Sequence, residues 1–198
     1  MKGIYLASKS PRRRELLAQI GVKHRVLSVD VPEQQGPNES PNEYVERLAR
    51  DKALAGCREL EAQGLPLAPV LGSDTLGVLQ GRVFEKPRDR ADAVAMLKTL
   101  SGQTHQILSA VALVLGDRVA VTTVTTDVTF RELGESEILR YWDTGEPADK
   151  AGAYAIQGMA AVFVERIEGS YSAVVGLPLT ETAQLLEDFG VALWHMDA

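Results

Sequence analysis

Three consecutive arginines, Arg12 to Arg14, stand where local structure does not explain them. They open an expected helix, whose unpaired backbone N–H groups already make that end positive. Three cations are unfavourable there unless an anion such as phosphate binds at the same end, with the hydroxyl of Ser8 as a further donor. The pattern also fits the alternative of solvated arginines that pair with nearby acids.

Lys52 lies on the apolar face of a second expected helix. It follows Val45 by seven residues, on the same stripe as Leu48 and Ala49. An ammonium group on such a face either enters a polar pocket or extends along its own methylene chain to solvent, which is the more common outcome. A pocket for phosphate beside this helix would favour the first alternative.

Asp74 ends a compact apolar run, residues 70–75, that we expect to be a core strand. Open α/β sheets present ligand-binding groups at the carboxyl ends of strands, so Asp74 is a candidate metal ligand or general base. The alternative is an aspartate that forms a turn with its own backbone. Lys86 adds a cation just before a helix that Asp89 can cap, again where phosphate would be stabilised, although an isolated tripeptide of this kind is usually only a solvated loop.

The elements that must position these residues alternate between helix and strand. Capping residues and apolar periodicity predict helices over residues 10–20, 41–62, 89–100, 136–142 and 178–189. Alternation and turn residues predict strands over 3–7, 24–31, 70–75, 104–115 and 118–130, and a hairpin from 162–167 and 171–175. We therefore expect an α/β or α+β chain with a mixed sheet.

Composition narrows the class of protein. The 198 residues, 45% of them hydrophobic, suffice for one domain with a real core. A formal net charge of -6 does not favour nucleic acid or an anionic membrane, and no apolar stretch approaches the roughly 20 residues that span a bilayer. The single cysteine, Cys57, and three scattered histidines predict neither an internal disulfide nor a structural zinc site. We expect a cytoplasmic protein that binds neither nucleic acid nor membrane.

Several motifs in order along nearly the whole chain resemble the Maf family, the septum-formation-inhibitor proteins that act as nucleoside triphosphate pyrophosphatases. The resemblance rests on the segments LASKSPRR at 6–13, RLARDKA at 47–53, LGSDT at 71–75, EKP at 85–87, LSGQTH at 100–105, DKAGAY at 149–154, IQG at 156–158 and VGLP at 175–178. Two small departures are Ser73, where alanine is commoner, and Asp51, where glutamate is frequent.

The resemblance implies a fold, a reaction and a set of partners. The fold is an elongated mixed sheet flanked by helices, similar to that of the inosine triphosphate pyrophosphatases. It forms a single domain over residues 1–198, with two lobes flanking a nucleotide cleft, and usually a homodimer. The reaction is hydrolysis between the α and β phosphates with a divalent cation, Mg²⁺ or Mn²⁺. Thr75, Gln157 and Arg12 resemble the branch that prefers dTTP and UTP.

The resemblance also implies roles for individual residues. Asp74, as general base, Lys52 and Lys86 would be catalytic, and Glu33 with Asp74 would hold the metal. The residues that bind substrate would be Ser8, Arg12 and Arg13 at the phosphates and Thr75 and Gln157 at the base. Two alternatives stay open: a 7-methyl-GTP pyrophosphatase of the same family, and a nucleotide-binding regulator of cell division.

Overall fold

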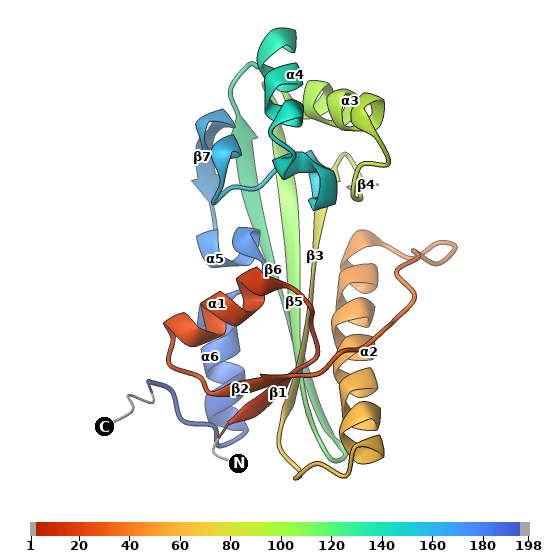
Figure 1. The fold of residues 1–198 in the computed structure, drawn as a ribbon, viewed down its shortest axis with the longest axis vertical. Coiled ribbons are helices and arrows are strands. Elements are labelled where there is room, and N and C mark those ends of the chain that lie inside the picture. Colours follow the sequence, from red (N-terminus) through yellow and green to blue (C-terminus); the bar gives the residue numbers. More distant parts are fainter. Residues whose placement is uncertain (1–2, 195–198) are drawn as a thin grey trace. The chain divides into compact units, whose positions relative to one another are not determined.

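The computed structural model of the protein describes residues 3–194 (Figure 1). Its helices are α1 (Pro11–Gln19), α2 (Pro41–Ala62), α3 (Arg90–Leu100), α4 (Glu135–Asp143), α5 (Tyr171–Val175) and α6 (Leu179–Asp188). Its strands are β1 (Ile4–Leu6), β2 (His24–Val26), β3 (Val70–Leu79), β4 (Arg82–Phe84), β5 (Thr104–Leu115), β6 (Arg118–Phe130) and β7 (Val164–Glu168). Short 3₁₀ turns cover Glu146–Asp149, Ala151–Ala153 and Met159–Phe163.

The described strands form one mixed sheet. Its order is β2-β1-β3-β5-β6-β7, and β4 pairs with β3 outside this path. Strand β1 is parallel to both β2 and β3, whereas β4 is antiparallel to β3 and β7 is antiparallel to β6. Helices flank the sheet, so the predicted mixed α/β class is confirmed. No helix within residues 3–194 is long and apolar enough to cross a membrane.

The chain divides into two compact units. Within the described residues, unit 1 comprises residues 3–74, 109–124 and 176–194, and unit 2 comprises residues 75–108 and 125–175. Strands β3, β5 and β6 each continue from one unit into the other. The single domain with a cleft between two lobes stays a prediction.

In unit 1, helix α2 packs closely on the strands. It begins at the predicted capping box, in which the Glu43 amide donates to the Ser40 hydroxyl at 3.3 Å and the Ser40 amide donates to the Glu43 carboxylate at 2.8 Å. A Cβ at Gly72 would collide with the Ala49 carbonyl and the Ala53 amide, so glycine lets the helix backbone approach β3. This approach fixes the neighbouring turn of α2, which carries Lys52, against β3.

Unit 2 combines a helix pair with an aromatic cluster. Helices α3 and α4 lie side by side, joined by ion pairs from Lys98 to Glu135 at 2.6 Å and from Arg90 to Asp143 at 3.3 Å. The aromatic cluster has edge-to-face contacts with ring centroids 4.8 to 6.0 Å apart and consists of His105, Phe130, Tyr141, Tyr154 and Phe163.

Two predicted strands are corrected by the structure. Strand β2 ends at Val26 rather than at residue 31, because its partner β1 ends at Leu6, and the last backbone bond runs from the Leu27 amide to the Leu6 carbonyl at 2.9 Å. The predicted hairpin is wrong in its second arm, because Tyr171–Val175 is helix α5. The Ser170 hydroxyl accepts from the Ala173 amide at 3.2 Å, which is the geometry of a helix cap.

Candidate active site

Lys52 lies between two carboxylates of unit 1. Its ammonium nitrogen is 2.6 Å from Oδ1 of Asp74 and 2.6 Å from Oε1 of Glu33. The side chains of Lys52 and Asp74 are only 11% and 12% exposed, whereas that of Glu33 is 51% exposed. Of the two alternatives for Lys52, the structure therefore bears out the less common one, an ammonium group that points inward, and the solvated alternative is wrong.

Asp74 occupies a different place in its strand from the one predicted. Strand β3 continues to Leu79, because its last residues pair with β4, so Asp74 lies in mid-strand. The strand that ends beside it is β1, which stops pairing with β3 at Leu71. The carboxylate thus lies past the carboxyl end of β1, and the alternative of a turn-forming aspartate is wrong.

Arg13 and Ser8 lie in the same unit and contact each other. The Arg13 guanidinium donates to the Ser8 hydroxyl at 3.2 Å and to the Gly176 carbonyl at 2.9 Å. Burial lowers the pKa of Arg13, against the opposing effect of the Asp74 and Glu33 carboxylates, and the charge of Arg12 lowers it further. The charges of Asp74, Glu33 and Arg12 therefore each lie close enough to Arg13 to act on it. We call Ser8, Arg13, Glu33, Lys52 and Asp74 the Asp74 cluster.

The first turn of α1 leaves donors near this cluster. Ser10 is the N-cap residue, as predicted, but its side chain makes no capping bond. The amide of Ser10 instead donates to the Ser8 hydroxyl at 3.2 Å. Arg12 is half-buried and Arg14 is exposed, so the three arginines differ in surroundings. This end of α1 combines cationic side chains with an N-cap residue whose side chain makes no capping bond.

The loop that carries Glu33 is held by Arg47, a residue to which the sequence assigned no role. Arg47 forms a two-pronged ion pair with Glu39, at 2.6 and 2.9 Å, and donates to the Gln34 carbonyl at 2.9 Å. The hydrogen bonds from Arg47 lower the pKa of Glu39 to about 2. The Gly36 amide donates to the same carboxylate at 2.8 Å. Arg47 thus ties residues 34–39 to α2.

Gly176 is a second residue that sequence reasoning missed. Its carbonyl accepts from the Arg13 Nε at 2.9 Å and from the Ser73 hydroxyl at 3.3 Å. Its φ of 140° lies in the region that favours glycine. The motif at 175–178 was noted without a role. Ser73, which departs from the commoner alanine, adds a hydrogen bond to the carbonyl that also holds Arg13.

Unit 2 carries the other three predicted site residues. Thr75 follows Asp74 in β3, Lys86 is exposed between β4 and α3, and Gln157 is exposed in a turn at residues 155–158. The Gly152 amide donates to the Glu85 carbonyl at 3.1 Å, which joins the segment before the turn to the segment of Lys86. The grouping of these three residues with the Asp74 cluster stays a prediction.

The donor set of the Asp74 cluster fits a divalent cation. One oxygen of Glu33 and one of Asp74 converge on the position of the Lys52 nitrogen, which lies 2.6 Å from each of them. Mg²⁺ in phosphate-transfer sites takes one or two carboxylates and completes its shell with substrate phosphates and water. No group of three or more potential metal ligands occurs within residues 3–194.

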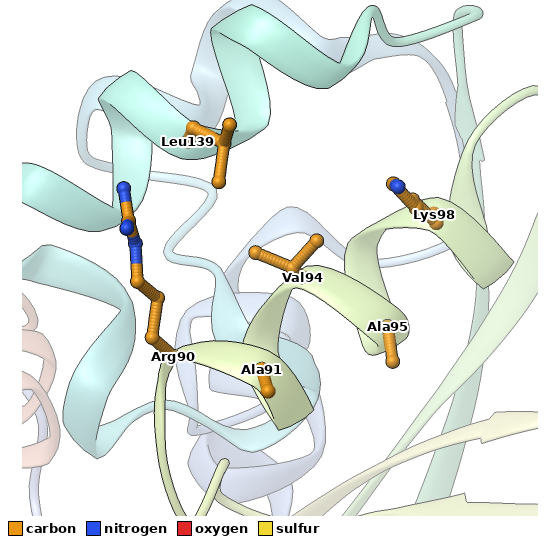
Figure 2. A pocket seen from close by; sticks show the side chains of 6 residues that line it. All are labelled: Arg90, Ala91, Val94, Ala95, Lys98 and Leu139. Atoms are coloured by element: carbon orange, nitrogen blue, oxygen red, sulfur yellow. The ribbon is translucent and has the colours of Figure 1, made fainter.

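A cavity of about 500 Å³ lies elsewhere, between α3 and α4 of unit 2 (Figure 2). Figure 2 shows the small and apolar side chains of Ala91, Val94, Ala95 and Leu139 lining it, with Arg90 and Lys98 alongside. None of the predicted site residues lines this cavity.

Comparison of the sequence with known proteins places the chain in a family. Residues 3–189 match the family of Maf-like proteins, and the chain belongs to this family. It is 60% identical to a dTTP/UTP pyrophosphatase of Saccharophagus degradans, over 97% of this chain and 91% of that protein. It is also 54% identical to a dTTP/UTP pyrophosphatase of Aromatoleum aromaticum, over 96% and 97%, and 53% identical to one of Hahella chejuensis, over 96% and 94%.

A solved structure, that of the Staphylococcus aureus Ham1 protein, aligns with 65% of this chain and 71% of its own. The TM-score is 0.41 and the sequence identity is 13%. This likeness is too weak to carry an argument about the fold.

Proposed function

We propose that this protein hydrolyses dTTP and UTP to the nucleoside monophosphate and pyrophosphate. The names of the relatives at 53–60% identity support this substrate class. The observation that carries the proposal is the contact of Asp74 with Lys52 at 2.6 Å, beside Arg13 and Ser8. A carboxylate that can accept a proton thus lies among cations and donors that suit a triphosphate.

In the proposed reaction, Asp74 orients a water molecule and accepts its proton as the water oxygen bonds to the α phosphorus. The bond from that phosphorus to the oxygen that bridges to the β phosphate breaks, and pyrophosphate leaves with the electron pair. Lys52, through its contact with Asp74, fixes the orientation of the carboxylate. The proton on Asp74 then passes to solvent, which restores the base.

Positive charge is the second requirement, because the leaving pyrophosphate gains charge in the transition state. Ser8, Arg12, Arg13, Lys52 and Lys86 are the proposed ligands of the phosphates. Glu33 and Asp74 are the proposed ligands of Mg²⁺ or Mn²⁺, which when bound would neutralise phosphate charge and polarise the phosphorus–oxygen bonds. We propose Thr75 and Gln157 as the residues that recognise the pyrimidine by hydrogen bonds.

The family resemblance supports two further parts of the proposal, a homodimer and a cytoplasmic location.

The test is release of pyrophosphate and monophosphate from dTTP, UTP, CTP, dATP, GTP and 7-methyl-GTP, with Mg²⁺ or Mn²⁺. Asp74→Asn is measured beside the wild type, and Asp117→Asn, on the exposed β5–β6 turn, is the control for the same chemical change. We expect preference for dTTP and UTP, a loss of about 10²- to 10⁴-fold in kcat for Asp74→Asn, and no loss for the control.

Other outcomes would count against particular parts of the proposal. Preference for 7-methyl-GTP would keep the reaction and overturn the substrate. Undiminished turnover by Asp74→Asn would overturn the base. Nucleotide binding without any turnover by the wild type would favour the regulatory alternative.

A further inference from the structure

The turn that carries Gln157 is short and held at both ends. The Gly158 amide donates to the Ala155 carbonyl at 3.0 Å, which closes the turn. Ile156 is buried, whereas Gln157 is exposed. An exposed glutamine on a flexible loop would recognise a base poorly, because ordering the loop and the side chain costs binding free energy. A turn whose backbone is fixed by its surroundings lowers that cost.

Two side chains, Tyr141 and Glu146, bind the backbone on both sides of Gln157. On the amino-terminal side, the Ala155 amide donates to the Tyr141 hydroxyl at 3.3 Å. On the carboxyl-terminal side, the amides of Met159 and Ala160 donate to the Glu146 carboxylate at 3.0 and 3.3 Å. The Tyr141 hydroxyl itself donates to Glu146 at 2.7 Å. One continuous chain of hydrogen bonds therefore spans the turn.

Gly158 makes room for this arrangement. A Cβ at position 158 would overlap the Glu146 carboxylate. The Glu146 carboxylate therefore takes the space that a side chain at position 158 would need. The glycine that follows Gln157 is thus explained by the carboxylate lying against it.

The Glu146 carboxylate accepts hydrogen bonds from three donors, the Tyr141 hydroxyl and the amides of Met159 and Ala160. An ionised carboxylate only accepts hydrogen bonds and has lone pairs for all three, whereas an amide would place a donor against a donor. Burial alone would raise the pKa of Glu146, but the Met159 amide, the Tyr141 hydroxyl, the Ala160 amide and the charge of Lys150 together lower it. Burial and the bond to Glu146 raise the pKa of Tyr141, so its hydroxyl stays a donor.

We infer that Tyr141 and Glu146 are positioning residues for Gln157 and, through it, determine the preference for UTP over CTP. This inference rests on the proposed function, because Gln157 is the proposed reader of the base. UTP and CTP differ in the hydrogen-bond donor and acceptor at one edge of the pyrimidine ring. If Gln157 is displaced, it therefore loses the hydrogen bonds that distinguish the two bases. Neither side chain needs to contact the nucleotide.

The turn has a separate anchor that the test leaves intact. The Tyr154 hydroxyl lies 2.7 Å from Nε2 of His105 within the aromatic cluster. Tyr141→Phe keeps the edge-to-face contact with Phe163, whose centroid is 5.0 Å away, and removes only the hydroxyl. The variant is therefore expected to fold.

The experiment is a double-mutant cycle of Tyr141→Phe and Gln157→Ala, with kcat/KM for UTP and CTP as the readout. We expect each single change to lower the UTP:CTP ratio, by about fivefold for Tyr141→Phe and about tenfold for Gln157→Ala. The double variant should be no less selective than Gln157→Ala, because Tyr141 acts through Gln157. Tyr171→Phe, at a half-exposed tyrosine of α5, is the matched control and should leave the ratio unchanged.

Two results of the cycle would overturn the inference. One is an unchanged ratio in Tyr141→Phe. The other is a further, additive loss of ratio in the double variant, which would give Tyr141 an effect independent of Gln157.

A second measurement separates failure of the inference from failure of the proposed function. Amide hydrogen exchange over residues 155–160 needs no nucleotide, and Glu146→Gln should speed exchange of the Met159 and Ala160 amides about tenfold or more. Unchanged exchange overturns the inference even if the wild type hydrolyses UTP. Wild type without selective turnover overturns the proposed function, and with it the role in selectivity, whatever the exchange rates are.

Discussion

The Asp74 cluster of unit 1 and the Gln157 turn of unit 2 are held in different ways. In the cluster, charged side chains contact each other directly, and Lys52 joins Asp74 and Glu33 at 2.6 Å. In the turn, backbone amides donate to the side chains of Tyr141 and Glu146, and the side chain of Gln157 is exposed. From this difference we expect changes in the Asp74 cluster to alter the rate of hydrolysis and metal binding, and changes around the Gln157 turn to alter selectivity between nucleotides.

The largest effect that would test this contrast is expected for Lys52→Met. The loss of the ammonium removes a phosphate ligand and the orienting partner of Asp74, so kcat should fall about 10²-fold. Binding of Mn²⁺ in the absence of nucleotide should tighten, because Asp74 and Glu33 keep their convergence without a competing cation. Kinetics and calorimetric titration with Mn²⁺ measure the two effects.

Lys98→Met is the control for that change, because Lys98 pairs with Glu135 in unit 2 at 2.6 Å. It should alter neither kcat nor Mn²⁺ binding. Weaker Mn²⁺ binding by Lys52→Met would contradict the assignment of the two carboxylates as metal ligands.

The next largest effect concerns pH and lies in unit 2. Burial lowers the pKa of His105 to about 4 from an ordinary value of 6.5, and Asp127 only partly offsets this. Since the unfolded state binds the proton more readily, the stability that His105 contributes is full above pH 6.5 and is lost as the pH falls towards 4. The loss over this range is about 3 kcal/mol.

Urea unfolding of the wild type and of His105→Asn across this pH range measures the effect. The variant should be less stable at neutral pH and show a flatter dependence on pH. The same slope in both proteins would mean that groups other than His105 cause the pH dependence.

A pair of glycines in β3 compares the packing of the two units. Gly72→Ala should destabilise the protein by about 2 kcal/mol, because a Cβ there meets the backbone of α2. At Gly77 in unit 2, a Cβ would lie 3.6 Å from that of Phe84, an ordinary contact, so Gly77→Ala should cost about 1 kcal/mol or less. Denaturant unfolding measures both, and equal losses would contradict the close approach of α2.

The smallest effect is expected for Arg47→Lys. Lysine cannot form the bidentate ion pair with Glu39 and, at the same time, donate to the Gln34 carbonyl. The loop that carries Glu33 should therefore become more mobile. The Mn²⁺ concentration for half-maximal activity should rise about threefold, while stability should change by less than about 1 kcal/mol. Arg88→Lys in unit 2 is the control, because it loses a similar bidentate ion pair, with Asp92. It should leave the Mn²⁺ dependence of activity unchanged.

Much of the fold could be predicted from the sequence because many helices and strands begin or end at local sequence signals such as capping boxes and turn glycines. The ends of α2, β5 and β6 agree with the predicted bounds, since a capping box begins α2 and the turn at Gly116 separates the two strands. Helix α5 was missed because five residues hold too few positions to show helical periodicity. The end of β2 was missed because it depends on where β1 ends.

The residue types of the site can be read from the sequence, and helical spacing puts Lys52 on the apolar face of α2. Whether Lys52 points inward, and which groups meet, depends on the tertiary structure. Arg13 and the Gly176 carbonyl that holds it are 163 residues apart, and no local pattern relates them. Likewise, Glu146 takes its place against Gly158 because packing brings three backbone donors to one carboxylate, and that convergence exists only once the chain has folded.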